Sequence, residues 1–481
     1  FLKQEAPEVD YATWVTGSRS EKIRPMAEHW AQVGFGTPVV LHLFYVLKVV
    51  AYVVAAWLVV LSTDGIDGFT QVKQWYDEPI VYQKVVLFTM LFEVVGLGCG
   101  FGPLNNRFSP PMGSILYWLR PGTIRLPPWP TRVPLTRGDT RTPLDAVLYG
   151  ALLVSLLVAL FSGGTGPLPE IGSEVGVLPM WEIWTILGVL AVLSLRDKVI
   201  FLAARGEVYA SLTVAFLIVG QSGVDMVLAL KLVCLTIWLG AATSKLTKHF
   251  PFVISTMMSN NPVLRPRWLK RKFFEHFPDD LRPGRPSRWI AHLSTAVEGL
   301  VPLVLFFSHG GTVAVIAAIV MLCFHFGILS AIPMGVPLEW NVFMMFSVLA
   351  LFIGHAEVGL SDMTSPWPAL LWAVVAGAVV LGNLFPRKIS FLPGMRYYAG
   401  NWDVGLWCVK PSASAKIEAN IVSIASMPQS QMVKYYGSPE NAQMMLYMGY
   451  AFRGFNSHGR AMFTLAHRAM AGIDESEYIL I

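Results

Sequence analysis

The chain has 481 residues, of which 54% are hydrophobic and 14% are charged, and its formal net charge is +5. Soluble globular domains carry about a quarter of their residues as charged side chains, so this composition excludes an ordinary soluble globular protein. The mean hydropathy is also positive. We infer that most of the chain lies within a lipid bilayer.

Apolar stretches recur along the chain, each of roughly the 20 residues that a helix needs to cross about 30 Å of hydrocarbon. Backbone groups inside a bilayer have no water to bind, so these stretches must be helical. The sequence predicts an all-α polytopic membrane protein with about ten transmembrane helices and a small α+β cytoplasmic C-terminal domain. The predicted spans are 38–62, 80–104, 143–162, 179–195, 199–220 and 223–244 within 38–244, and 289–307, 311–331, 338–354 and 367–385 within 289–385.

Lysine and arginine in the loops predict the orientation, because short loops rich in these residues stay in the cytoplasm. Six arginines lie in the Pro/Arg-rich loop at 105–142, and ten lysines and arginines lie in the loop at 245–288. The loops on the other side carry acidic residues, namely Asp64, Asp67, Glu170, Glu174, Glu357 and Asp362. Both termini are therefore predicted to be cytoplasmic, with the protein in the plasma (inner) membrane of a bacterium.

Both cytoplasmic loops contain aromatic residues that favour the membrane interface. In 105–142, proline-stiffened turns accompany Tyr117, Trp118 and Trp129, a combination typical of an elbow in the headgroup layer. In the second loop, the run RPRWLKRKFFEHF predicts an interfacial helix that binds anionic lipid headgroups at 262–288. The positive-inside bias already explains these basic residues, so we expect no nucleic-acid partner.

The two ends of the chain are more polar than its middle. The cytoplasmic N-terminal segment 1–37 lacks a short apolar region with a small-residue cleavage site, so we expect no removable signal peptide. Residues 386–481 combine helix-like stretches at 438–452 and 457–472 with the strand-like run VGLWCV, which predicts the α+β domain. Because the chain ends on the apolar run EYILI, we expect this domain to continue beyond residue 481. The four cysteines show no C-x-x-C spacing, and we expect neither a disulfide nor a metal site.

Four charged residues are predicted to lie inside the bilayer, namely Lys48, Glu93, Lys231 and Glu298. A charge near the midplane costs about 3 kcal/mol, so each needs a partner, a water-filled cavity or a function. Spans 1 and 2 form a hairpin, as do spans 6 and 7, which predicts the pairs Lys48–Glu93 and Lys231–Glu298. We interpret these pairs either as ion pairs that fix helix register or as the lining of a polar cavity.

Neighbouring side chains favour the cavity. Tyr45 and Tyr52 flank Lys48 on one face of its helix. We therefore predict that Lys48, Tyr45, Tyr52, Glu93 and Lys231 bind a ligand.

Three apolar motifs in the second half carry a family resemblance. They are WLGAATSKL at 238–246, STAVEGLVPLVLFF at 294–307 and CFHFGILSAIP at 323–333. In this order they resemble the HTTM (horizontally transferred transmembrane) family, which includes the membrane portion of vitamin K-dependent gamma-carboxylases. The resemblance implies that Lys245 is a base that deprotonates a quinol, and that Glu298 and His325 orient a headgroup or relay protons. An amine beside an apolar wall loses solvation as an ammonium, which suits it to accept a proton.

Two features depart from the carboxylases. The predicted topology puts Lys245 at the cytoplasmic end of span 6, whereas the carboxylase site faces the lumen, and the large extracytoplasmic substrate domain has no counterpart here. We therefore do not expect carboxylation. In the alternative interpretation, Lys245, Lys248 and His249 anchor the end of the span by reaching the headgroup layer. His325, alone on an apolar helix, is by itself more typical of a hydrogen-bonded core residue.

The whole chain also resembles an uncharacterised actinobacterial, chiefly mycobacterial, multi-pass membrane family. Three functions are compatible with the sequence: a protein whose intramembrane cavity binds a lipid, quinone or isoprenoid, an accessory or scaffold subunit of a cell-envelope complex, and a membrane enzyme with Lys245 or Glu298 as base. The expected partners are membrane lipids, further copies of the chain or subunits of such a complex. Nucleotide, haem and zinc-protease motifs are absent, so we predict no cofactor other than a bound lipid or quinone.

Overall fold

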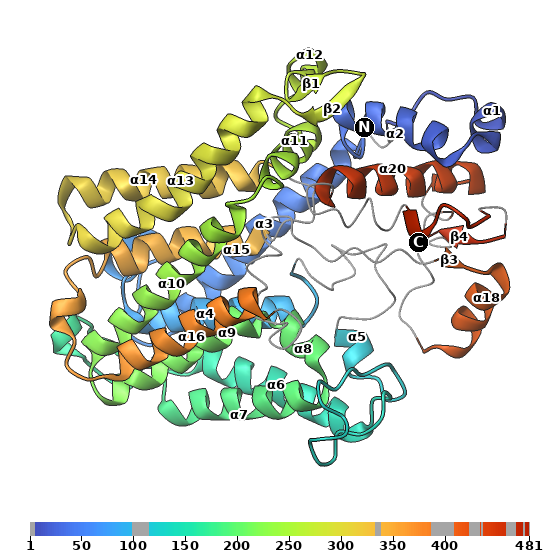
Figure 1. The fold of residues 1–481 in the computed structure, drawn as a ribbon. Helices are drawn as coiled ribbons and strands as arrows, with labels where there is room; N and C mark the ends of the chain where they lie inside the picture. Colours follow the sequence, from blue (N-terminus) through green and yellow to red (C-terminus); the bar gives the residue numbers. More distant parts are fainter. Residues whose placement is uncertain are drawn as a thin grey trace.

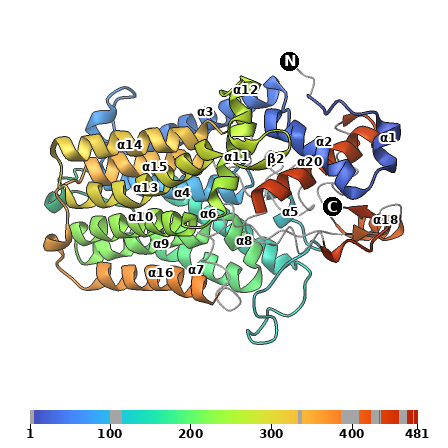
Figure 2. The ribbon, with the colours of Figure 1, turned by 45° about the horizontal axis from the view of Figure 1, so that its top comes forward.

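The computed structural model describes residues 5–98, 115–331, 338–385, 408–422, 433, 436–457, 468–474 and 477–480. In these residues, helices form a long bundle with a group of shorter helices at one end (Figure 1, Figure 2). The bundle contains α3 (Val39–Leu61), α4 (Pro79–Val94), α6 (Pro143–Phe161), α7 (Met180–Arg196), α8 (Lys198–Ala203), α9 (Gly206–Phe216), α10 (Gly223–Lys245), α13 (Arg285–Phe307), α14 (Gly311–Leu329), α15 (Leu338–Ser347) and α16 (Trp367–Leu384).

Each predicted span contains helix, although the helix in 80–104 ends at Val94 and the span 199–220 is divided into α8 and α9 by a turn at Ala204 and Arg205. Not every helix is long enough to cross a bilayer. Five are long and apolar enough, namely His42–Leu61 of α3, α6, α10, α13 and α14. By contrast, α4 has 16 residues, about 24 Å of helix against about 30 Å of hydrocarbon. A helical membrane protein is confirmed. Five helices of the described part, not the predicted ten, meet both requirements, and the apolar stretches Gly206–Gly220, Glu339–Ile353 and Trp367–Gly382 are shorter.

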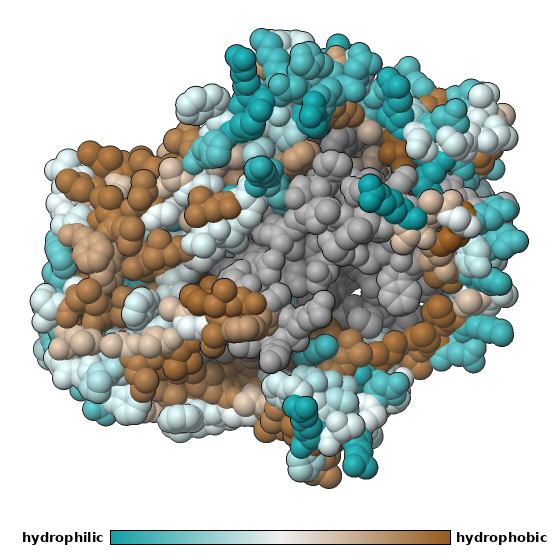
Figure 3. Space-filling view, in the orientation of Figure 1, coloured by the Kyte–Doolittle hydropathy of each residue, from teal (hydrophilic) through white to brown (hydrophobic). Residues whose placement is uncertain are grey.

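The centre of the bundle is α10, whose side chains are nearly all buried by its neighbours. In contrast, α13 and α14 expose large apolar side chains, including Trp289, Leu300 and Phe326. Figure 3 shows the apolar surface that covers this part of the bundle. Soluble proteins rarely expose so much apolar surface, so we infer that this face contacts lipid.

The group of shorter helices, which we call the peripheral unit, combines three segments that are far apart in the sequence. It contains α1 (Tyr11–Thr16), α2 (Arg19–Val33), α11 (Phe250–Asn260), α12 (Arg267–Arg271), β1 (Phe274–His276), β2 (Asp280–Pro283) and α20 (Pro439–Ser457). Its core includes Trp30, Phe273 and Met448. The Trp30 ring packs edge-on against Phe35, with centroids 4.1 Å apart, and its centroid lies 5.1 Å from that of Phe452.

The interfacial helix predicted at 262–288 is wrong. Only α12 and the first turn of α13 are helical in this range, because the turn-forming residues Pro278 and Asp279 connect β1 to β2 in a hairpin. The hairpin and α12 bury Phe273 in the peripheral unit, whereas Trp268 remains exposed. The aromatic residues of this loop therefore serve mainly to build a protein core.

The C-terminal part contributes α18 (Pro411–Asn420), α20 and an antiparallel sheet of β3 (Cys408–Val409) and β4 (Ile479–Leu480). The predicted helix at 438–452 corresponds to α20, and β3 lies in the predicted strand run VGLWCV. Most of the predicted helix at 457–472 lies outside the described residues.

Replacing Trp30 tests the core of the peripheral unit. Trp30→Ala should destabilise the unit by about 3–5 kcal/mol, because it removes a large buried side chain and leaves a cavity. Hydrogen exchange of the full chain in detergent should become faster in α2 and α20, with little change in α10. Trp268→Ala, which removes an exposed tryptophan from the same unit, is the matched control. Equal exchange in the two variants would contradict the packing described for Trp30.

The buried amine of Lys270 makes the stability of the peripheral unit depend on pH. Its Nζ donates a hydrogen bond to the carbonyl oxygen of Ser259 at 2.6 Å, and burial lowers the pKa of Lys270 from 10.5 to about 8. The unfolded unit binds this proton more tightly, so stability should rise from about pH 8 toward pH 10.5, with the burial penalty fully present below pH 8.

Thermal melting of the full chain at a series of pH values measures this dependence. In Lys270→Met, which has no titrating amine at this position, the rise above about pH 8 should flatten. A variant that keeps the parental rise would show that another group causes it.

Candidate functional site

Lys48 is buried in α3 and pairs with Glu339 in the first turn of α15, with 2.5 Å between Nζ and Oε1. The predicted pair of Lys48 with Glu93 is therefore wrong. Equal depth on adjacent helices does not fix how each helix is rotated about its axis. Because α15 packs against both α3 and α4, it brings a carboxylate to Lys48 from a distant part of the chain.

Glu93, on α4, pairs instead with Arg205, with 2.9 Å between Oε1 and Nε. Arg205 lies between α8 and α9 in a left-handed conformation, with φ of 47°. Its guanidinium carbon lies 6.0 Å from the ring centroid of Trp340. Glu93 is also within electrostatic range of Lys48 and Glu339. Two buried cations and two buried carboxylates thus form one neutral cluster.

The tyrosines predicted to accompany Lys48 differ in their surroundings. Tyr52 is buried, and its hydroxyl shares a hydrogen bond of 2.6 Å with the Thr89 hydroxyl on α4. Tyr45 is half-buried two turns earlier on α3. The sequence argument missed Arg205 and Glu339, although each is a charge within or beside an apolar stretch.

Lys231 lies in a different part of the bundle from Lys48. Its Nζ donates hydrogen bonds to the carbonyl oxygens of His355 and Val358, the second at 2.7 Å. The predicted pair of Lys231 with Glu298 is wrong, because Lys231 lies about 21 Å before Lys245 along the axis of α10. Glu298 lies beside Lys245.

The three residues predicted to be catalytic, Lys245, Glu298 and His325, converge where α10, α13 and α14 meet. Lys245 ends α10, and its Nζ forms an ion pair with Oε2 of Glu298. The same Nζ lies 5.5 Å from the ring centroids of Phe250 and Phe324, within the range of a cation–π contact. His325 is within electrostatic range of Lys245. The arrangement can hold a polar group at the boundary of an apolar region.

Hydrogen bonds fix the proton position on His325. The indole nitrogen of Trp238 lies 3.2 Å from Nε2, and Oδ1 of Asn341 lies 3.0 Å from Nδ1. An indole N–H can only donate, so Nε2 accepts and the proton of a neutral imidazole is on Nδ1, which donates to Asn341. Both ring nitrogens are thus engaged, and His325 is better placed to position its neighbours than to transfer a proton.

The other titratable groups after α10 differ from Lys245. Lys248 is exposed, whereas His249 is buried, so the anchor interpretation fits Lys248 and does not describe Lys245. Within the ranges that the structure describes, no group of three or more His, Cys, Asp or Glu side chains is placed to hold a metal ion.

The Lys48–Glu339 pair can be tested by removing one or both charges. Glu339→Gln should destabilise the bundle by about 3–5 kcal/mol, because Lys48 then stays buried without this carboxylate. The double variant Lys48→Met, Glu339→Leu should recover most of the loss, since apolar side chains replace a buried ion pair at little net cost. Thermal unfolding of the full chain in detergent measures both effects. A double variant no more stable than the single variant would contradict this assignment.

Comparison with known proteins identifies the family to which the chain belongs. A family model described as "Transmembrane protein of unknown function (DUF3556)" matches residues 1–481. No curated protein and no solved structure matches the chain. The family description agrees with a helical bundle that exposes an apolar face, while the HTTM resemblance and the actinobacterial source stay predictions. The chain belongs to the DUF3556 family of transmembrane proteins.

Proposed function

We propose that the protein binds a membrane-soluble molecule, a lipid, quinone or isoprenoid, with the polar head of that molecule beside Lys245, Glu298 and His325. One observation carries the proposal: an ion pair, a hydrogen-bonded histidine and two aromatic rings meet where α10, α13 and α14 adjoin α11. Such a combination of an apolar wall with a few convergent polar groups is typical of ligand sites.

The place of the charged pair along its helix distinguishes it from the rest of the bundle. Lys245 is the last residue of α10 and is followed by Leu246 and Lys248, which are both exposed. We therefore place the ligand at this boundary of the packed interior. We assign the Lys48–Glu339 pair to helix packing.

The ion pair supports binding better than base catalysis. Each partner stabilises the charged form of the other, so Lys245 would have to leave Glu298 before it could accept a proton. An ammonium group has three N–H donors, and the pair with Glu298 accounts for one of them. Lys245 can therefore also donate to a carbonyl, hydroxyl or phosphate oxygen. An enzyme with Lys245 or Glu298 as base is the alternative that the HTTM resemblance implies.

The arrangement of the basic loops supports an orientation. The loops that precede α6 and α13 lie at the same end of the bundle as the peripheral unit (Figure 2). Basic loops stay in the cytoplasm, so we assign this end, with Lys245 and the peripheral unit, to the cytoplasmic face of a bacterial plasma membrane. The peripheral unit would be the contact surface if the chain were an accessory subunit.

Lipid mass spectrometry tests the proposed ligand site. The full chain, purified in mild detergent, should retain a co-purifying lipid or quinone at about one molecule per chain, as one site implies. The double variant Lys245→Met, Glu298→Gln should retain about tenfold less, because it loses charge-assisted hydrogen bonds to the headgroup.

The double variant Lys48→Met, Glu339→Gln is the matched control, since it removes a lysine–glutamate pair of the same type elsewhere in the bundle. It should keep the ligand. Equal retention in both variants, or equal loss from both, would contradict the proposed site. For the alternative enzyme, the Lys245 variant would lose turnover while keeping the ligand.

A further inference from the structure

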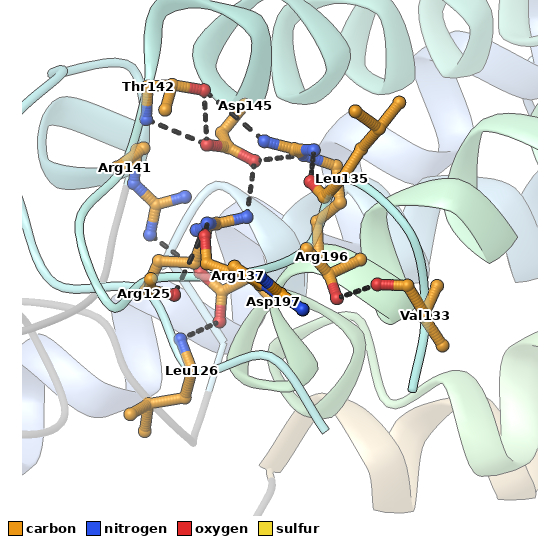
Figure 4. Close-up of polar contacts among 12 residues, drawn as sticks. Arg125, Leu126, Val133, Leu135, Arg137, Arg141, Thr142, Asp145, Arg196 and Asp197 are labelled. Atoms are coloured by element: carbon orange, nitrogen blue, oxygen red, sulfur yellow. Dashed lines mark hydrogen bonds and ion pairs between the residues drawn. The ribbon is translucent and has the colours of Figure 1, made fainter. Parts of the chain in front are cut away.

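A second cluster of charges is buried at the base of the loop between α5 (Ile115–Trp118) and α6. Asp145, in the first turn of α6, accepts a hydrogen bond from Nε of Arg196 at 2.5 Å and lies 3.6 Å from Nη1 of Arg125. Asp197 accepts a hydrogen bond from Nη2 of Arg141 at 2.7 Å. Figure 4 shows the arginines and the two carboxylates interleaved at this place.

The cluster holds one more cation than anions. Among the residues that the structure describes, the carboxylates paired with Arg125, Arg141 and Arg196 are those of Asp145 and Asp197, and all five side chains are buried. In the part of the chain that the structure describes, Nε and Nη1 of Arg125 and Nη1 of Arg141 have no hydrogen-bond partner. A buried charge without a counter-ion is costly, so this place favours an anion.

A hollow lies in the same loop, and two of its lining residues, Leu135 and Arg137, contact the cluster through their backbone carbonyl oxygens. It has a volume of about 500 Å³ and is lined by residues 131–135 and Arg137. Nη2 of Arg125 donates to the carbonyl oxygens of Arg137 at 2.6 Å and Gly138 at 3.3 Å, so the buried cation is one hydrogen bond away from a residue that lines the hollow. Arg132 and Arg137, which both line the hollow, are exposed.

The tip of the loop exposes apolar side chains. Leu135 has φ of 62°, a left-handed conformation that costs a leucine about 1–2 kcal/mol, and its carbonyl oxygen accepts a hydrogen bond from Arg196. Its side chain is 85% exposed, and Trp129 is also exposed. In Figure 1 and Figure 2 the loop projects sideways from the end of the bundle, next to the ends of α6 and α7. If this end of the bundle lies at the membrane surface, a loop that projects sideways would reach the headgroups of the surrounding lipid.

From these observations we infer that residues 129–138 form a binding site for the phosphate of anionic membrane lipids. Trp129 and Leu135 enter the apolar edge of the headgroup layer, while Arg132 and Arg137 contact the phosphate from the front. The excess positive charge behind Arg137 completes the attraction. This site is separate from the one at Lys245, and neither proposal depends on the other.

Spin labelling of the full chain in lipid nanodiscs tests the site. A label on Leu135→Cys, with the native cysteines replaced by alanine, should be more accessible to oxygen than to a water-soluble nickel complex in discs of phosphatidylcholine with phosphatidylglycerol. A label on Asp139→Cys, an exposed residue at the base of the same loop, is the control and should show the opposite preference. Adding Arg132→Gln and Arg137→Gln should raise nickel accessibility at position 135 about tenfold in these discs, because two phosphate contacts are lost.

Two outcomes would overturn the inference. One is nickel accessibility at position 135 equal to that at position 139, which would place the loop tip in water. The other is an arginine-dependent stabilisation of the protein by inorganic phosphate in phosphatidylcholine discs, together with no difference between the two lipid mixtures. That result would identify a site for free phosphate and not for a lipid headgroup.

Discussion

Charge buried among apolar helices is the interaction on which the arrangement of this bundle depends. Lipid is as apolar as leucine, so apolar packing alone determines the rotation and depth of each helix only weakly. The pairs Lys48–Glu339 and Lys245–Glu298 reduce that freedom, because a charge without a partner in the interior costs several kcal/mol. One pair joins α3 to α15 and the other joins α10 to α13. The bundle is therefore held in register by electrostatics between helices that are distant in the sequence.

The positions of the helices follow from the sequence because hydropathy is a local property, expressed within about 20 residues. The HTTM resemblance also selects Lys245, Glu298 and His325 as a group, and in the structure these three residues lie close together. The partners of Lys48 and Glu93 could not be predicted, because pairing depends on how each helix is rotated against neighbours that chain order does not specify. Their true partners lie at the ends of helices, where a charge usually indicates a span boundary.

The peripheral unit could not be predicted for a related reason. Trp30 in α2, Phe273 before β1 and Met448 in α20 belong to segments that are each too short and too polar to bury a core alone. Each local pattern therefore predicts something else: a cytoplasmic N-terminal segment, an interfacial helix in 262–288 or a separate C-terminal domain. Only the tertiary contact between the three segments reveals that their apolar residues complete one core, and this contact is absent from any single stretch of sequence.

Lys245 and Glu298 lie where the bundle joins the peripheral unit, so the geometry of the pair depends on both parts. The ring of Phe250, on α11, lies beside the ammonium of Lys245. Glu298 is in the middle of α13, whose first turn is held in the peripheral unit, where the Ser287 hydroxyl donates to the carbonyl oxygen of Phe273 at 2.7 Å. The ligand that we propose beside the ion pair would therefore contact side chains whose positions depend on both α11 and α13. If that ligand binds one placement of α11 and α13 more tightly than another, a partner that holds the peripheral unit in the favoured placement would, by linkage, raise the affinity for the ligand by the factor by which the ligand raises the affinity for the partner.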